Sequence, residues 1–320
     1  MENPKTIDLH QDLRLHVERR DLFPGDHWQT GFEMLEKANV QLTVASGFPV
    51  PPEENFLDPL ANSLIEEDFI AYNTYAKEHS NWSVVTNKSE LTTLLASPNQ
   101  SGLLLHVEGL NVFAGEWDML ERWYGLGWRS LGIVWNINNS LGGGTKDPSQ
   151  GLTKLGTEML NWLQEHHMVV DLAHMNAPTF YDAVKIMRQP IVISHGNVAA
   201  LCPNPRNYTD EQLKLVAASG GVVGIFFAST YLIGKERGPG NVSDVVDHID
   251  YLKKLIGIDH VALGTDFGGV TTGLLSDIDT ISKIDLFWTE LQKRGYTEEE
   301  IQKIAHLNAA RVLNDILPTN

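Results

Sequence analysis

Two histidines each follow a short apolar run in the middle of the chain. The run MVVDLAH ends at His174, and the run PIVISH ends at His195. Continuous Val, Ile and Leu residues are typical of strands buried on both faces, as parallel strands covered by helices are. Since α/β proteins place their chemistry at the carboxyl ends of parallel strands, we expect both histidines at the rim of a sheet.

Other predicted strand ends carry further metal-binding side chains. The first strand, which begins TIDLH, delivers His10 and Asp12 two residues apart, so both side chains share one face and can reach one cation. The strand GLLLHVEG ends near Glu108, and burying this carboxylate is costly unless it meets a cation or a donor. The last predicted strand, HVALGTDFGG, delivers Asp266. Together with the two histidines, these residues form a candidate metal site.

Apolar strand candidates alternate with helical segments along the chain. They lie at residues 6–10, 41–48, 102–109, 129–136, 168–174, 190–195, 222–227 and 260–269. This alternation predicts a parallel sheet, and eight such units predict a closed (β/α)8 TIM barrel, formed by a single domain over residues 1–320. An open doubly wound sheet is the competing fold. We favour the barrel because only a ring brings all the polar strand ends to one centre.

The composition fits a large folded domain. Of the 320 residues, 42% are hydrophobic and 20% are charged, with a formal net charge of -17. This acidity disfavours a nucleic-acid partner, because phosphate contacts need clustered Lys and Arg. We see no membrane-spanning run and no secretory signal, and the single cysteine, Cys202, fits a reducing compartment. We therefore expect a cytoplasmic protein without a membrane partner.

The candidate ligands are more than one ion needs. Three imidazoles and up to three carboxylates suit two divalent ions that share a bridging carboxylate. Zinc is favoured by the nitrogen and oxygen ligands, although manganese, iron or cobalt fit similar sites. Such a pair would generate hydroxide near neutral pH, and Asp266 would then take the proton and return it to a leaving amine. Arg206 offers a planar fork for a substrate carboxylate, or alternatively forms a surface salt bridge.

A series of short motifs runs over nearly the whole chain. They are His10-x-Asp12, Glu108-Gly, Gly127-x-Arg129, Gly151-Leu-Thr, Asp171-Leu-x-His174, Ser194-His195, Pro205-Arg206-Asn207-x-x-Asp210, Asp247-His-x-Asp250 and Asp266-Phe. In this order they resemble the renal (membrane) dipeptidase family of zinc-dependent, amidohydrolase-like barrels. The combined order is far more specific than any one motif.

The resemblance implies a role for each candidate residue. Two zinc ions would be bound, the first by His10 and Asp12, the second by His174 and His195, and both by Glu108. Asp266 would transfer the proton, and Arg206 would contact the terminal carboxylate of the substrate. The resemblance also implies dipeptide substrates, including those with a D-residue in second position, some β-lactams, and a homodimer.

Three departures from the family pattern concern the substrate pocket. Trp135 stands where the family has a histidine that polarises the scissile carbonyl, and an indole N–H can donate one hydrogen bond but cannot take up a proton. Gly268 and Phe226 replace an Asp and an Asn of the family. These changes predict a less polar pocket for a bulkier or more apolar substrate. We expect Trp135 and Tyr231 to contact that substrate.

The residues are compatible with three functions. The first is a metallohydrolase that cleaves the amide bond of a dipeptide or a small N-acyl amino acid. The second is a metal-binding relative whose catalysis is lost or redirected because of Trp135. The third is a single-metal deaminase or phosphoesterase, which would have no need of Arg206. We expect the first, since the set of metal ligands is complete.

Overall fold

The structure is a computed structural model that describes residues 3–13, 28–48, 60–270 and 272–319. Its strands are β1 (Thr6–Gln11), β2 (Val40–Gly47), β3 (Trp82–Val84), β4 (Ser101–Glu108), β5 (Trp128–Gly132), β6 (Val169–Asp171), β7 (Val192–Gly196), β8 (Val222–Ile225) and β9 (Val261–Leu263). Its α-helices are α2 (Phe32–Lys37), α3 (Leu60–Glu78), α4 (Lys88–Ala96), α5 (Trp117–Gly125), α6 (Lys154–Glu165), α7 (Ala177–Val184), α8 (Asp210–Ala218), α9 (Ser229–Leu232), α10 (Val242–Ile256), α11 (Asp285–Lys293), α12 (Glu298–Gln302) and α13 (Asn308–Ile316). Short 3-10 turns are η1 (Lys235–Arg237), η2 (Ile258–His260) and η3 (Ile281–Lys283), and η4 (Lys303–Leu307) is a π-helical segment.

The strands belong to one sheet, in the order β2-β1-β9-β8-β7-β6-β5-β4-β3, and β2 also pairs with β4. The sheet therefore closes on itself, which confirms the predicted (β/α)8 barrel. The chain divides into two compact units, residues 1–44 with 193–312 (the first unit) and residues 45–192 with 313–320 (the second unit). One boundary between the units falls within β2, after residue 44, and another falls within β7, after residue 192. A single domain over the whole chain stays a prediction.

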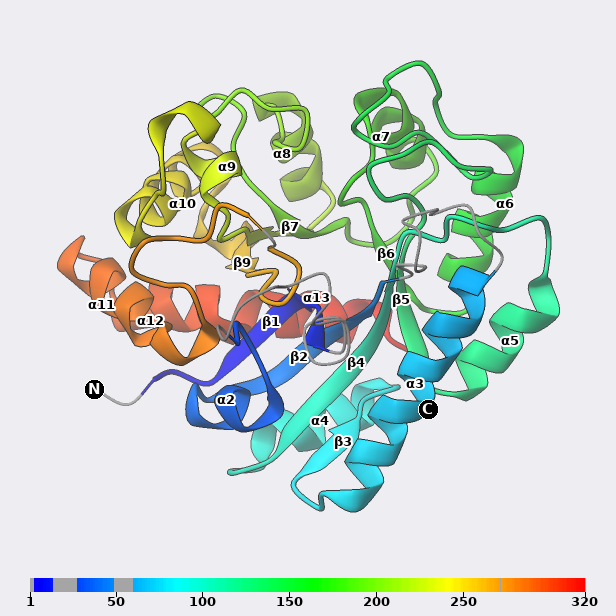
Figure 1. Cartoon of the computed structure of the whole chain (residues 1–320), viewed down its shortest axis with the longest axis horizontal. Helices are drawn as coiled ribbons and strands as arrows, with labels where there is room; N and C mark the ends of the chain where they lie inside the picture. The colour runs from blue at the N-terminus through cyan, green and yellow to red at the C-terminus, as the bar shows by residue number, and fades with distance from the viewer. Residues whose placement is uncertain (1–2, 14–27, 49–59, 271, 320) are drawn as a thin grey trace. The chain divides into compact units, whose positions relative to one another are not determined.

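In the first unit, parallel pairing holds strands β1, β9 and β8 in register. Strand β1 pairs with β9 at Asp8 and Leu263, and β9 pairs with β8 at Val261 and Val223. All six residues of β1 are buried, as expected for a strand of a closed parallel sheet. Helix α10 packs on β8 and β9 and contacts α8, α9 and α11, beside which it lies in Figure 1.

In the second unit, β3, β4, β5 and β6 pair in parallel. The register shifts between Leu105 and His106 of β4, and the rest of this strand then pairs with β5 up to Glu108 and Gly132. Helices α3, α5 and α6 pack against neighbouring strands, and α3 runs beside β4 in Figure 1. The Trp123 and Trp128 rings meet edge to face beneath α5, with centroids 5.8 Å apart.

Several sequence predictions about strands are corrected. The strands predicted over 168–174 and 260–269 are wrong at their ends, because β6 ends at Asp171 and β9 ends at Leu263. The sequence pattern missed β3, a three-residue strand in which only Trp82 is buried. The strand predicted over 129–136 is wrong at its end, because β5 ends at Gly132. The side chain of Asn139 donates a hydrogen bond of 2.8 Å to the carbonyl of Ile133, so a loop takes the place of the next ladder bond. Trp135 therefore lies beyond the strand, in a loop.

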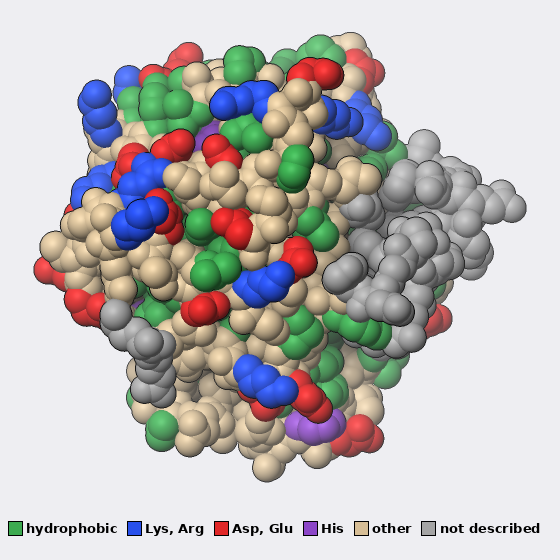
Figure 2. All heavy atoms as spheres, turned by 60° about the vertical axis from the view of Figure 1, so that its left-hand side comes forward, with side chains coloured by type: hydrophobic (Ala, Val, Ile, Leu, Met, Phe, Trp, Pro, Cys, Tyr) green, Lys and Arg blue, Asp and Glu red, His purple; other side chains and the backbone are tan. Residues whose placement is uncertain are grey.

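Acidic and basic side chains lie next to one another on the face drawn in Figure 2. Several form ion pairs between helices of the first unit, such as Arg294 with Asp247 and Lys253 with Glu300. Exposed pairs of this kind contribute little to stability, typically about 0–1 kcal/mol each. Among the helices that the structure describes, none combines the length and the apolar character that a bilayer crossing requires.

Candidate metal centre

The ends of β1 and β9 bring three metal-binding side chains of the first unit together. Asp266 N–H donates to the His10 carbonyl and Asp12 N–H to the Phe267 carbonyl, both at 3.0 Å, so the two segments stay side by side beyond the strands. Nε2 of His10 lies 3.8 Å from Oδ2 of Asp12 and 3.7 Å from Oδ1 of Asp266. All three residues are buried. The predicted grouping of these residues is thus present.

This cluster has the donor set of a divalent cation site. One ligand atom from each of His10, Asp12 and Asp266 lies within 4.8 Å of the others. Oδ1 of Asp12 is buried and accepts no hydrogen bond from any of the residues that the structure describes. Two buried carboxylates beside one imidazole repel each other strongly unless a cation or a shared proton compensates their charge. The residues therefore fit a divalent metal with nitrogen and oxygen ligands.

His195 joins the same cluster from the end of β7. It is fully buried, and its ring centroid lies 4.2 Å from that of His10. The hydroxyl of Ser194 contacts Nδ1 of His195 at 2.9 Å, so Nε2 is the nitrogen that would bind a metal. A hydrogen bond at the second ring nitrogen is the usual way in which a protein orients a histidine ligand.

The second unit holds the other predicted ligands, Glu108 and His174. Nε2 of His174 lies 2.8 Å from Oε1 of Glu108, and both side chains are buried. Nδ1 of His174 lies 2.8 Å from Oδ1 of Asn136, which also accepts from the hydroxyl of Thr145. Nδ1 therefore donates to Asn136, and the Nε2 lone pair faces a carboxylate oxygen. Such a pair is stable only with a proton or a cation to share.

Two of the candidate residues adopt a left-handed backbone conformation that non-glycine residues seldom adopt. The φ angle is 63° for His174 and 60° for Asp266. Backbone outliers of this kind cost about 1–3 kcal/mol and cluster at functional sites. His174 lies three positions after the end of β6, and Asp266 lies three positions after the end of β9. The unusual backbone therefore sets the direction of each side chain just beyond the strand end.

Trp135 lies beside the ligands of the second unit. Its ring centroid is 6.0 Å from that of His174 and 5.1 Å from that of Phe48. Nζ of Lys146 stands 5.3 Å from the Trp135 ring, within the range of a cation–π contact. Trp135 also packs closely against the backbone of Gly109, just after β4. Only glycine fits there, since a Cβ at position 109 would lie 2.8 Å from Cβ of Trp135.

Arg206 is buried in the first unit, and its two terminal nitrogens have no hydrogen-bond partner among the residues that the structure describes. The residue is only 5% exposed. Its guanidinium carbon lies 5.9 Å from the centroid of Phe226, whose ring is stacked 5.1 Å from that of Tyr231. Because a buried cation is costly without a partner, and no ion pair of Arg206 with a described residue is present, the geometry does not favour the alternative of a surface salt bridge. The arrangement suits a carboxylate supplied by a ligand.

The family model described as Membrane dipeptidase (Peptidase family M19) matches residues 1–319. The chain belongs to this family. It is therefore a hydrolase that acts on peptide bonds, as predicted. Membership sets aside the alternative of a deaminase or phosphoesterase.

Several known proteins are similar to this membrane dipeptidase family member. An uncharacterized protein in the pqqA 5' region of Klebsiella pneumoniae is 36% identical over 67% of this chain and 82% of its own length. An uncharacterized dipeptidase of Schizosaccharomyces pombe is 30% identical over 96% of this chain and 79% of its own length. A metallo peptidase from Rhodobacter sphaeroides, solved with a phosphinate mimic of the dipeptide L-Ala-D-Ala, is 22% identical, with a TM-score of 0.87 over 99% of this chain and 100% of that one. This last likeness concerns the fold alone.

A buried network that sequence analysis did not single out supports the centre of this dipeptidase relative. Asp8 lies inside β1 and accepts hydrogen bonds from the side chains of Gln11 and Thr265, each at 2.6 Å. It also accepts from the Thr265 and His10 backbone amides, and burial raises the pKa of its carboxyl. Thr265 precedes Asp266, and His10 is itself a candidate ligand. Asp8 therefore connects the end of β1 to the segment that follows β9. The alternation of Asp8 with His10 was the only signal in the sequence.

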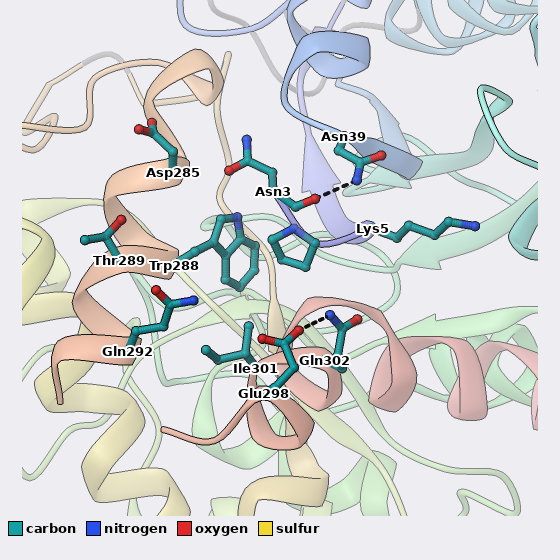
Figure 3. A pocket seen from close by; sticks show the side chains of 11 residues that line it. Asn3, Lys5, Asn39, Asp285, Trp288, Thr289, Gln292, Glu298, Ile301 and Gln302 are labelled. Carbon is teal, nitrogen blue, oxygen red and sulfur yellow. Dashed lines mark hydrogen bonds between the residues drawn. The ribbon is translucent and has the colours of Figure 1, made fainter. Parts of the chain in front are cut away.

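The pocket in Figure 3 lies at the opposite, amino-terminal end of β1, in the first unit. It has a volume of about 530 Å³ and is lined by Asn3, Pro4, Lys5, Asn39, Asp285, Trp288, Thr289, Gln292, Glu298, Ile301 and Gln302. Two hydrogen bonds connect lining residues of this pocket. The Asn39 side chain donates to the Asn3 carbonyl, and the Gln302 side chain donates to Glu298. In contrast to the cluster around His10, no histidine or cysteine is present among these lining residues of the dipeptidase family member.

Gly269 gives a direct test of the carboxylate cluster. A Cβ at this position would meet Oδ2 of Asp12 at 2.2 Å and Oδ1 of Asp266 at 2.4 Å. Gly269→Ala should therefore displace both carboxylates and weaken metal affinity by about 10- to 100-fold, as loss of a supporting contact does. Metal affinity is measured by competition with a chromogenic chelator. Gly125→Ala is the matched control, because a Cβ there meets nothing within 4 Å. Unchanged affinity in Gly269→Ala would remove Asp12 from the metal site.

Proposed function

We propose that the chain hydrolyses the amide bond of dipeptides, L,D-dipeptides included, or of small N-acyl amino acids. The observation that carries the substrate class is the buried guanidinium of Arg206, which has no carboxylate partner among the described residues. All of the proposed substrates carry a free carboxylate next to the amide that is cleaved. A structurally similar metallo peptidase from Rhodobacter sphaeroides was solved with a phosphinate mimic of the dipeptide L-Ala-D-Ala, and this dipeptide belongs to the proposed substrate class.

Two divalent ions, preferably zinc, are proposed as the cofactor. The carboxyl ends of all strands in a (β/α)8 barrel meet at one face. On this ground we assign one ion to His10 and Asp12 and the other to His174 and His195, with Glu108 shared between them. When bound, such ions would lower the pKa of a water molecule toward neutrality and polarise the substrate carbonyl.

The remaining side chains have separate tasks in this proposal. Asp266 takes the proton from the attacking water and delivers it to the leaving amine, which balances the hydrolysis. Arg206 binds the terminal carboxylate through two parallel N–H donors and thereby orients the substrate. The Tyr231 ring is stacked on Phe226, the residue that lies beside Arg206, and is proposed to contact the substrate there. Trp135 can give the scissile carbonyl one hydrogen bond, but no positive charge.

A second candidate function is a metal-binding relative with lost or redirected catalysis. The observation that favours it is the position of Trp135, whose ring lies 6.0 Å from the proposed ligand His174. If the indole stabilises the carbonyl oxygen poorly, Trp135→His should raise kcat for dipeptides by about 100-fold, the effect of one oxyanion donor. Steady-state kinetics with Trp117→His as control checks this. No gain in kcat would show that Trp135 does not limit catalysis.

The proposed function is tested with zinc-loaded protein and a panel of L,L-dipeptides, L,D-dipeptides and N-acyl amino acids. Hydrolysis of at least one class, lost after chelation and restored by zinc, is the expected outcome. Two bound ions without any hydrolysis would favour the second candidate. One ion per chain, with turnover that does not depend on Arg206, would contradict the binuclear assignment.

We also propose a cytoplasmic, single-domain homodimer that binds neither nucleic acid nor membranes. The acidic composition, the single cysteine and the family resemblance support this. Light scattering coupled to size exclusion measures the oligomeric state, and one cooperative calorimetric transition is expected for a single domain. A monomer, or two separate transitions, would overturn the corresponding statement.

A further inference from the structure

We propose that Phe226 and Tyr231 form a subsite that selects an apolar side chain on the carboxyl-terminal residue of the dipeptide. This inference rests on the proposed function, because it places the substrate carboxylate on Arg206. It concerns a position at which this chain departs from its family, where Phe226 replaces an asparagine. The subsite lies entirely within the first unit.

Phe226 stands between the proposed metal ligands and the carboxylate-binding cation. Its ring meets that of His195 edge to face, with centroids 5.2 Å apart, and lies 5.9 Å from the guanidinium carbon of Arg206. A dipeptide must span the distance between the reacting carbonyl and its terminal carboxylate. The residue that carries the carboxylate is therefore the one that passes Phe226.

The surface around this path is apolar. Phe226 forms a cluster with Ala228 and Val270, and the partly buried Tyr231 and Leu274 pack against it. The rings of Phe226 and Tyr231 are stacked, with centroids 5.1 Å apart and an interplanar angle of 24°. Tyr231 and Leu274 remain partly accessible, so a substrate side chain can bury apolar area against them.

Hydrogen bonds fix this wall relative to Arg206. The side chain of Asn197 donates to the Phe226 carbonyl at 3.0 Å and accepts from its N–H at 3.3 Å. Asn207, next to Arg206, donates at 2.8 Å to the Tyr231 carbonyl. A hydrogen bond therefore connects the segment that carries Arg206 to the aromatic wall formed by Phe226 and Tyr231. A rigid wall selects more strictly than one that can reshape itself around a polar side chain.

Leucine and asparagine test the subsite, because they have nearly the same shape and opposite polarity. An asparagine amide pressed against this wall loses its hydrogen bonds to water without replacement. We expect kcat/KM for L-Ala-L-Leu to exceed that for L-Ala-L-Asn by about 10- to 100-fold in the zinc-loaded protein. Phe226→Asn should lower this ratio by about tenfold, whereas Phe226→Leu should keep it. Leu286→Asn, an exposed position on α11, is the matched control.

A second variant and a binding assay keep the inference testable in every case. If Phe226→Asn does not fold, Tyr231→Asn at the accessible end of the wall should lower the same ratio. The affinities of two phosphinate dipeptide mimics, one with a leucine-like and one with an asparagine-like side chain, report the preference even without turnover. Absence of dipeptide hydrolysis would count against the proposed function alone. Equal affinity of the two mimics, or an unchanged ratio in both Asn variants, would overturn the subsite.

Discussion

Asp266→Asn is expected to lower kcat for dipeptides by about 1,000- to 10,000-fold, because it removes the group that takes and returns the proton. The asparagine amide has nearly the same shape as the carboxylate but cannot accept a proton at neutral pH. Nε2 of His10 lies 3.7 Å from Oδ1 of Asp266, and the left-handed backbone aims this side chain at the cluster. We expect both ions to remain bound, since five other ligands are assigned to them. Stopped-time assays of dipeptide hydrolysis measure kcat, and elemental analysis measures the number of ions bound per chain.

Asp259→Asn is the control for this variant, since Asp259 is paired with Lys303 away from the cluster. It should leave kcat unchanged. Full activity in Asp266→Asn would remove this residue from the mechanism. Loss of an ion together with activity would instead make Asp266 a metal ligand.

Arg206→Met is expected to lower kcat/KM for dipeptides by about 100- to 1,000-fold, because it removes two charge-assisted hydrogen bonds to the substrate carboxylate. The same variant should hardly affect dipeptide amides, which lack that carboxylate. It should also keep or raise the melting temperature, since it removes the desolvation cost of a buried cation that has no ion pair with any described residue.

The comparison of dipeptides with their amides is measured by steady-state kinetics. Arg122→Met is the control, because Arg122 is exposed and paired with Glu66. An equal loss for dipeptides and their amides would show that Arg206 acts through the structure of the site and does not bind the carboxylate. A large fall in melting temperature would point the same way.

The strand ends were predictable because buried parallel strands leave a strong apolar signal. The runs before His174 and His195 are apolar except for Asp171 and Ser194, a pattern typical of buried parallel strands. The short strand β3 left almost no signal, since two of its three residues are not buried. The same holds for short helices such as α4, whose start depends on a cap by Asn87.

Contacts between residues far apart in the sequence could not be predicted. In the Gly-rich segment 138–151, for example, the side chain of Asn139 donates hydrogen bonds to the carbonyls of Leu110 and Ile133. Likewise, the sequence left open whether Arg206 meets a carboxylate of the protein. That depends on which side chains surround it after folding, and the answer decided the substrate class proposed here.

The number of divalent ions bound by the purified protein tests the central claim most directly. Inductively coupled plasma mass spectrometry on zinc-loaded, desalted protein should give two ions per chain, and chelation should remove them together with dipeptide hydrolysis. A protein that binds no metal, or whose dipeptide hydrolysis is indifferent to chelators, would contradict the account.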